Sequence, residues 1–378
     1  MYLKKKSIKF QKNYFHKIVM NVVLIMTGGR SGADFLQSLF DGHHQILQFP
    51  GILKFDEKLI RLFNLKSEKN ISKYFIKNYG HFFDSRLNKI ERHHKLGKSK
   101  KSFYTVEKKN FINKFAEYYN NSQKTNFDIL VSLHKAYDNK SDKKKTLIIH
   151  VHLFQFLKNY IKLIGIKKND KILLTLRDPL VSLISTIKHW MRFRKGIDLT
   201  PRNLFSNLDL HFNNFNNLLF LKKKIRVVKL EKLHIHSEKT LKKICKYINI
   251  DYSKILLKST YHGKKWWGDA ISKRYLNGIN RNFKNIFDKN FFTEKEILLF
   301  ESKLFYIIKK YNYSFRSDIN ISANSSYLRP FSFEKKVWIK TLKFNSFKSI
   351  LSCPIFYIKR YFLLKKNNVL NKDLPNEV

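Results

Sequence analysis

An apolar stretch followed at once by a glycine-rich turn restricts the fold of this chain most. Residues 22–27 are apolar apart from a closing threonine, and residues 28–32 read Gly-Gly-Arg-Ser-Gly. Residues 33–41 then place apolar side chains at helical spacing before Gly42. This order predicts a buried parallel strand, a turn whose backbone N–H groups can surround an anionic oxygen cluster, and a helix.

The alternation of short strands and helices returns later in the chain. In between, residues 55–145 show helical patches separated by loops rich in Lys, Asn and Ser, which predicts a helical insertion. Parallel strands joined by helices need cover on both faces, so we predict a three-layer α/β sandwich with a central parallel sheet. The later strands are predicted at residues 146–152, 171–176 and 225–230, and the later helices at residues 154–164, 180–194, 203–221 and 237–247.

The two ends of the chain differ from this pattern. Residues 1–19 form a predicted basic extension, residues 20–315 the α/β domain, and residues 316–378 a basic, aromatic appendage. Lys and Arg number 76 against 28 Asp and Glu, and the net charge of +48 indicates an anionic partner. The only cysteines are Cys245 and Cys353, too few for a disulfide framework, which favours a reducing cytoplasm.

The glycine-rich turn lacks a feature of magnesium-dependent nucleotide loops. Those loops end in Gly-Lys-Ser/Thr, where the lysine contacts the terminal phosphate and the hydroxyl binds magnesium. This chain has Gly32, Ala33 and Asp34 there, which disfavours a magnesium-dependent kinase. A tight turn without any ligand stays open as the alternative.

A second candidate anion site follows the strand predicted at residues 171–176. Arg177 begins the sequence Arg-Asp-Pro, and Ser185 lies eight residues later. An arginine at the carboxyl end of a parallel strand and a serine two turns along the next helix both approach the crevice where α/β sheets bind ligands. Arginine offers paired donors to phosphate, and serine adds a hydroxyl donor. The alternative is a helix-entry turn with Pro179 at the first helical position.

Together these motifs resemble those of sulfotransferases that use PAPS (3′-phosphoadenosine-5′-phosphosulfate). Residues 29–43 are similar to the family's loop for the 5′-phosphosulfate, and Arg177 with Ser185 is similar to the pair that holds the 3′-phosphate. The resemblance extends over residues 20–290 and implies a P-loop NTPase-like fold with PAPS as co-substrate. The donor-binding residues that it implies are Gly28, Gly29, Arg30, Ser31, Gly32, Ala33, Asp34, Arg177 and Ser185.

Weaker similarities follow in the order that the family has. Residues 227–234 are similar to a strand ending in Glu-x-Leu, and residues 240–250 to the helix after it. Residues 259–269 resemble a late loop that closes over the nucleotide, which implies that Lys264 and Lys265 approach the 3′-phosphate. An exposed charge pair is the alternative for these lysines.

His150 and His152 are the candidates for the proton acceptor. A hydroxyl becomes a good nucleophile when a positioned base takes its proton, and histidine does so near neutral pH. Alternation along a strand puts both on one face, about 7 Å apart. His-Val-His-Leu is similar to the Lys-Thr-His-Leu stretch of cytosolic sulfotransferases, where His152 takes the place of the catalytic histidine and His150 that of the lysine. Other members of the family use glutamate as the base. Two alternatives for these histidines stay open: a histidine that packs in the core, and a metal site, for which no third ligand is apparent.

One departure from the family concerns Ala33 and Asp34. They stand where family loops carry hydroxyls that donate to the 5′-phosphate. A carboxylate repels a phosphosulfate unless it turns away or pairs with a basic group. Asp34 is therefore predicted either to cap the helix or to weaken donor binding.

The predicted reaction is transfer of a sulfuryl group from PAPS to a hydroxyl or amine of a glycan, lipid or small metabolite. Arg30 and the loop amides stabilise charge on the 5′ side, His152 acts on the acceptor, and no metal is required. Two alternatives stay open: a magnesium-dependent phosphotransferase with Asp178 as metal ligand, and a non-catalytic, basic surface-binding relative of the fold. No specific nucleic acid is expected as a partner.

The appendage contains a candidate membrane surface, because residues 336–351 mix bulky apolar residues with lysines. Such a stretch can lie in an anionic membrane interface, which makes the chain peripheral to the membrane. Packing onto the protein's own core is the alternative. The residues concerned are Trp338, Ile339, Leu342, Phe344, Phe347, Ile350 and Leu351, with Lys336, Lys340, Lys343 and Lys348.

Overall fold

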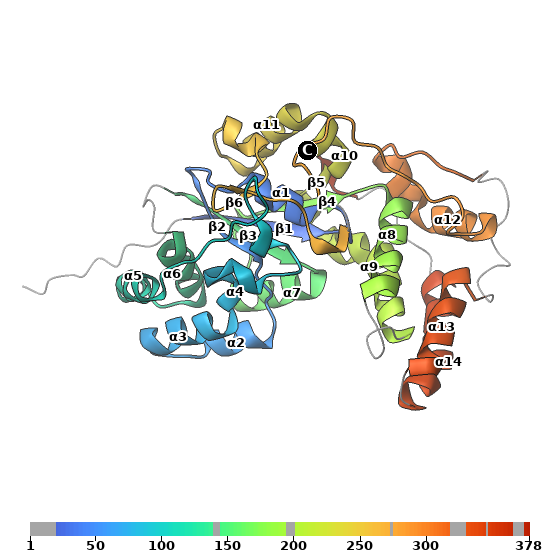
Figure 1. Cartoon of the computed structure of the whole chain (residues 1–378), viewed down its shortest axis with the longest axis horizontal. Helices are drawn as coiled ribbons and strands as arrows, with labels where there is room; N and C mark the ends of the chain where they lie inside the picture. The colour runs from blue at the N-terminus through green and yellow to red at the C-terminus, as the bar shows by residue number, and fades with distance from the viewer. Residues whose placement is uncertain are drawn as a thin grey trace, which may run out of the picture.

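The protein has a central sheet between two layers of helices (Figure 1). The predicted basic extension at residues 1–19 lies outside the described residues. The computed structural model describes residues 20–138, 144–193, 201–272, 275–317, 330–344, 347–365 and 374–378.

The strands of the sheet run parallel in the order β2-β3-β1-β4-β5-β8. The strands predicted at residues 146–152 and 171–176 are confirmed to the residue. Neighbouring parallel strands need long crossover connections, which helices supply here. The strands are β1 (Asn21–Thr27), β2 (Ile46–Ile52), β3 (Thr146–His152), β4 (Lys171–Leu176), β5 (Ile225–Lys229) and β8 (Asn376–Glu377).

Helices fill most of the chain between the strands. Those predicted after β3, β4 and β5 are confirmed within a few residues at each end. The helices are α1 (Ala33–Leu39), α2 (Glu57–Phe63), α3 (Glu68–Asn78), α4 (Gly80–Phe83), α5 (Lys108–Asn120), α6 (Asn126–Asp138), α7 (Phe154–Leu163), α8 (Pro179–Phe193), α9 (Pro201–Leu218), α10 (Leu230–Ile235), α11 (Ser237–Ile248), α12 (Glu294–Lys310), α13 (Ser332–Phe344) and α14 (Phe347–Lys365).

Alternate residues of strands β1 to β5 point into two separate cores. Val22 and Leu24 of β1 pack in the larger core with residues of α2 to α9 and α12. Val23 and Ile25 pack in the smaller core with α1, α10 and α11. Helices therefore cover both faces of the parallel sheet, and the predicted three-layer α/β fold class is confirmed.

A strand that the sequence analysis missed precedes the helical insertion. β2 contains Pro50 and Gly51, which interrupt the pattern typical of strands, and it lies at the edge of the sheet, where proline is tolerated. Helices α2 to α6 follow β2 and lie together at one end of the molecule (Figure 1).

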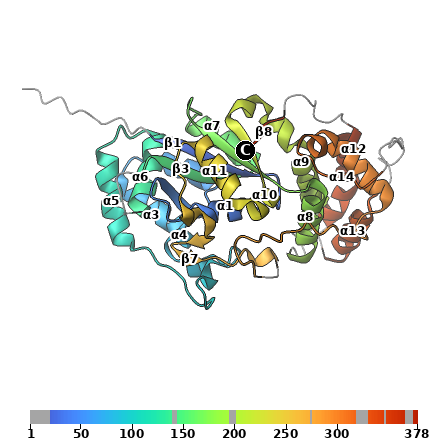
Figure 2. The same ribbon diagram turned by 90° about the horizontal axis from the view of Figure 1, so that it is seen from above.

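The appendage packs against the domain through a helix and a strand, among other contacts. α14 packs against α9, where the buried Arg360 places Nε 3.0 Å from Oε1 of Glu334 and its guanidinium over the Phe331 ring. The end of the chain forms β8, which pairs with β5 and was not predicted. Figure 2 shows α13 and α14 beside α12, beyond α8 and α9. The side chains of residues 340–350 lie outside the described ones. None of the helices in the described ranges is long and apolar enough to cross a membrane.

Candidate active site

The glycine-rich loop joins β1 to α1, and two of its glycines cannot carry a side chain without strain. Gly29 has φ +86° and Gly32 has φ +87°, in the left-handed region that favours glycine. A Cβ on Gly29 would lie 2.9 Å from Nε2 of His211, and a Cβ on Gly32 would lie 2.5 Å from Cδ1 of Leu230. The loop is therefore closed in by α9 and α10.

We expect Gly32→Ala to lower the free energy of unfolding by about 2 to 4 kcal/mol. The new methyl group would meet Leu230 and would also add the strain of a positive φ. Gly165→Ala is the matched control, because Gly165 has φ +83° and no described atom lies within 4 Å of its Cβ position. The control should lose only about 1 to 2 kcal/mol, which is what a left-handed conformation costs a residue with a Cβ. Urea unfolding measures both losses, and equal losses would contradict this account of the loop.

Ser31 ties the loop to β1 and β4. Its Oγ donates to the Thr175 carbonyl oxygen at 2.9 Å, and it lies 2.8 Å from Oγ1 of Thr175 and 2.9 Å from Oγ1 of Thr27. The amide of Gly28 donates to the same hydroxyl at 3.2 Å. Because Ser31 is buried and its hydroxyl has these partners, its predicted contact with the donor rests on its backbone N–H.

Arg177 follows β4 and lines the same hollow as Gly28 of the glycine-rich loop. The hollow is small, with a volume of about 20 Å³, and its lining includes Gly28, Arg177 and Ser182. Ser182, in the first turns of α8, donates to the Gly29 carbonyl oxygen at 2.6 Å. The helix that follows the second motif thus holds the loop of the first. Ser185 is half-buried on the same helix.

The segment that contacts Arg177 was not predicted from the sequence. Nε of Arg177 donates to Oδ1 of Asn285 at 2.9 Å, and the Phe283 ring centre lies 5.8 Å from the guanidinium carbon. Asn285 in turn donates to Oε1 of Glu231 at 2.5 Å. No sequence signal distinguished Asn285, because the segment around it is rich in asparagine.

Lys264 and Lys265 form β7 (Lys264–Lys265), which pairs with β6 (Thr260–Tyr261) in a hairpin. The ammonium of Lys265 donates to Asn277 and lies 4.0 Å from the ring centre of Trp267. These contacts differ from those of Arg177, which touches residues 283 and 285. An approach of the two lysines to a 3′-phosphate stays a prediction.

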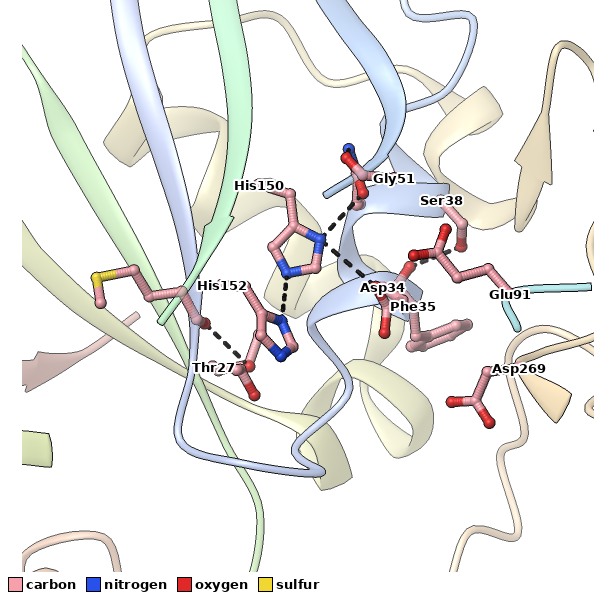
Figure 3. A network of polar contacts seen from close by, with 12 residues as sticks. Thr27, Asp34, Phe35, Ser38, Gly51, Glu91, His150, His152 and Asp269 are labelled. Carbon is pink, nitrogen blue, oxygen red and sulfur yellow. Dashed lines mark hydrogen bonds and ion pairs between the residues drawn. The ribbon is translucent and has the colours of Figure 1, made fainter. Parts of the chain in front are cut away.

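His150 and His152 end β3 and contact each other directly (Figure 3). Nδ1 of His152 lies 3.3 Å from Nε2 of His150, and the ring centres are 5.3 Å apart. As predicted, both rings lie on one side of the strand, but closer together than a regular strand places them. The register of β3 against β1 shifts here, and His152 has φ +73°, which turns its ring back toward His150.

Burial makes both histidines weak bases. It lowers the pKa of His150 to about 3 and that of His152 to about 3, and for His152 the neighbouring His150 adds to the effect. Both rings are therefore neutral near pH 7. Neutral His152 therefore has a free lone pair for a proton, but its pKa lies well below the value near 7 that favours general base catalysis at neutral pH.

Asp34 turns toward the histidines. The N-cap residue of α1 is Gly32, which makes no side-chain cap bond, so the capping alternative for Asp34 is wrong. Oδ1 of Asp34 lies 3.5 Å from Nδ1 of His150, and Figure 3 shows Asp34 between His150 and Glu91. Burial raises the pKa of Asp34, and the neighbouring His152 opposes this rise.

Two further carboxyl groups face this cluster, and neither was predicted as a site residue. Burial, with Asp34 as the next contribution, raises the pKa of Glu91 to about 8. Glu91 belongs to the helical insertion, where no motif marked it. Asp269 accepts a hydrogen bond from Nη1 of Arg30 at 3.0 Å. This ion pair links the glycine-rich loop to the late segment that was predicted to close over the nucleotide.

Comparisons with known proteins found similarity among solved structures, whereas no protein-family model and no curated protein matches the chain. The sulfotransferase domain of the olefin synthase from Synechococcus PCC 7002 is 15% identical, with a TM-score of 0.39, and the match covers 68% of this chain and 81% of that domain. The sulfotransferase domain from the curacin biosynthetic pathway is 14% identical, with a TM-score of 0.38, and the match covers 79% of this chain and 99% of that domain.

Proposed function

We propose that this chain is a sulfotransferase that transfers a sulfuryl group from PAPS to a hydroxyl or amine acceptor. The observation that carries the proposal is the meeting of three motifs at one edge of the sheet. His152 ends β3, the glycine-rich loop follows β1, and Arg177 follows β4, and these three strands are neighbours. Open α/β sheets bind ligands at the carboxyl ends of such central strands.

The glycine-rich loop and Arg177 suit PAPS as the donor. Arg177 can give a 3′-phosphate charge-assisted hydrogen bonds, and the loop supplies backbone N–H groups for the 5′ side. Asp34 is the group that opposes binding, since a carboxylate repels a phosphosulfate. Its raised pKa and its position against His150 reduce that repulsion.

PAPS supplies a sulfuryl group activated by its bond to the 5′-phosphate. The residues of the chain position the reactants and balance charge. Arg30 and the loop amides oppose the charge that develops on the 5′ side. Neutral His152 accepts the acceptor's proton while the acceptor atom bonds to sulfur and the bond from sulfur to the phosphate oxygen breaks, which leaves adenosine 3′,5′-bisphosphate.

The environment of Asp178 disfavours the phosphotransferase alternative. Asp178 is buried, and Oδ1 accepts from the Val181 amide at 3.1 Å. Oδ2 accepts from Nη2 of Arg316 at 2.5 Å. Both oxygens are thus used to cap α8 and to hold an arginine, whereas a magnesium ligand needs an oxygen available to the ion.

A binding comparison followed by a transfer screen tests the proposal. Calorimetry should give a lower Kd for PAPS than for ATP with magnesium or for inorganic phosphate. Labelled sulfate from PAPS should then appear on members of a panel of glycans, lipids and small hydroxylated metabolites. Preference for ATP would favour the phosphotransferase, and equal affinity for PAPS and phosphate would favour the non-catalytic alternative.

We also infer that α14 attaches the protein to an anionic membrane surface. Its face opposite the buried Arg360 carries four apolar side chains, each more than half exposed and spaced three or four residues apart. Exposed Lys359 and Lys365 flank this face on its two sides. Apolar residues between lysines are typical of helices that lie in a membrane interface. The four residues, named here the α14 stripe, are Leu351, Ile355, Ile358 and Phe362.

Replacing the α14 stripe by four glutamines should abolish co-sedimentation with vesicles that contain phosphatidylserine. The full chain should bind these vesicles at low salt and lose most of the binding as salt screens the lysines. The control is Phe220→Gln with Ile286→Gln, since these side chains are 66% and 73% exposed elsewhere on the molecule. Failure of the full chain to bind, or equal binding by the stripe variant, would refute membrane attachment.

A further inference from the structure

We propose that Gln37 and His150 are positioning residues that fix the ring proton of His152 on Nδ1 and leave the lone pair of Nε2 for the acceptor. The inference rests on the proposed function, because it assigns a protonation pattern to the proposed base. A chain of hydrogen bonds carries it from α1, through Gln37, to the end of β3.

The first step is the orientation of the Gln37 side chain. Its Nε2 donates to the carbonyl oxygens of Phe49 at 2.8 Å and of Gly51 at 3.1 Å. Both carbonyls lie where the pairing of β2 with β3 is interrupted, which leaves them facing α1. Because a carbonyl oxygen only accepts, the amide nitrogen must face β2. The amide oxygen must then face the opposite direction, where it lies 3.1 Å from Nδ1 of His150.

The second step fixes the proton of His150. Two oxygens face its Nδ1, namely Oε1 of Gln37 at 3.1 Å and Oδ1 of Asp34 at 3.5 Å. An amide oxygen has no proton to give, so Nδ1 of His150 must be the donor. A neutral imidazole carries one ring proton, and Nε2 of His150 therefore holds a lone pair.

The third step carries this pattern to His152. Nδ1 of His152 lies 3.3 Å from Nε2 of His150. Because Nε2 of His150 holds a lone pair, Nδ1 of His152 must donate the hydrogen bond. The proton of neutral His152 is thus on Nδ1, and Nε2 is the acceptor. Figure 3 shows that this second nitrogen points away from His150, on the side of the phosphate loop. Gln37 and His150 are each 1% exposed, so water cannot easily replace either partner.

Nitrogen-15 NMR of the full chain reads this pattern directly, because protonated and unprotonated ring nitrogens have different shifts. His134 is an internal reference: its Nδ1 lies 2.8 Å from the Leu130 carbonyl oxygen, which requires a proton on Nδ1. We expect His150 and His152 to give the same neutral pattern as His134. Resonances are assigned with His150→Phe and His152→Asn. A proton on Nε2 of His152 in the unmodified chain would overturn the proposal.

Variants test whether the chain of bonds causes the pattern. Gln37→Leu should leave His152 as a mixture of both tautomers and lower kcat about 10- to 100-fold, with the Kd of PAPS unchanged within about twofold. Gln48→Leu is the matched control, since Gln48 donates to the backbone carbonyl of Gln37 and takes no part in the chain. It should keep both the pattern and kcat. An unchanged His152 pattern in Gln37→Leu would overturn the proposal.

His150→Phe gives a second test in case Gln37→Leu does not fold. It keeps a buried ring but removes the nitrogen that accepts from His152, so the His152 pattern should again become mixed. A pattern still fixed in this variant would refute the role of His150. The proposed function fails separately: if His152→Asn keeps full turnover while the NMR pattern is as expected, the positioning chain stands and the assignment of His152 as the base is lost.

Discussion

His152→Ala is expected to lower kcat by a factor of about 100 to 10,000 while the Kd of PAPS barely changes. Nε2 of His152 is the proposed proton acceptor, and its ring contacts His150 rather than the hollow that includes Arg177. Without the ring, the variant lacks the proposed proton acceptor and turns over more slowly. The residues proposed to bind PAPS stay in place. Labelled-sulfate transfer gives kcat, and calorimetry gives the Kd.

The control must separate lost chemistry from backbone strain, because His152 has φ +73°. Asparagine tolerates this region better than alanine, so His152→Asn should fold as the unmodified chain does and show the same loss of kcat. His236→Ala, at an exposed histidine, should keep full turnover. If His150→Ala lowers kcat by a factor of about 100 to 10,000 and His152→Ala does not, the assignment of His152 as the base is wrong.

Arg177→Ala is expected to weaken PAPS about 10- to 150-fold and adenosine 5′-phosphosulfate much less. The two nucleotides differ only in the 3′-phosphate, which is the group that Arg177 is proposed to hold. Loss of a charge-assisted hydrogen bond costs about 1.5 to 3 kcal/mol, which corresponds to that range of Kd. Calorimetry with both nucleotides measures the difference.

Two further variants locate the 3′-phosphate. Lys264→Ala with Lys265→Ala should leave the ratio of the two affinities unchanged if the phosphate lies beside Arg177, Phe283 and Asn285. Arg226→Ala controls for loss of one positive charge, since Arg226 lies on β5 over the Tyr247 ring. Equal weakening of both nucleotides by Arg177→Ala would contradict the assignment.

Local sequence patterns predicted those parts of the fold and of the site that are set by residues close together in the sequence. Strands β3 and β4 could be placed to the residue because their apolar runs end at polar residues, and the glycine loop because left-handed turns need glycine. β2 was missed because Pro50 and Gly51 break the pattern, and only pairing with β3 makes this segment a strand. β8 was missed because two residues carry no periodicity; its partner β5 lies far away in the sequence.

The sequence by itself determined the layered α/β fold, the loop after β1, and the positions of Arg177 and His152 at strand ends, because periodicity and turn chemistry act over a few residues. Only the tertiary structure decided that Asn285 meets Arg177, that Asp34 turns to His150 instead of capping its helix, and that Gln37 orients a pair of histidines. Each of these is a contact between segments far apart in the chain. Such contacts depend on how the layers pack, and packing leaves no local pattern in the sequence.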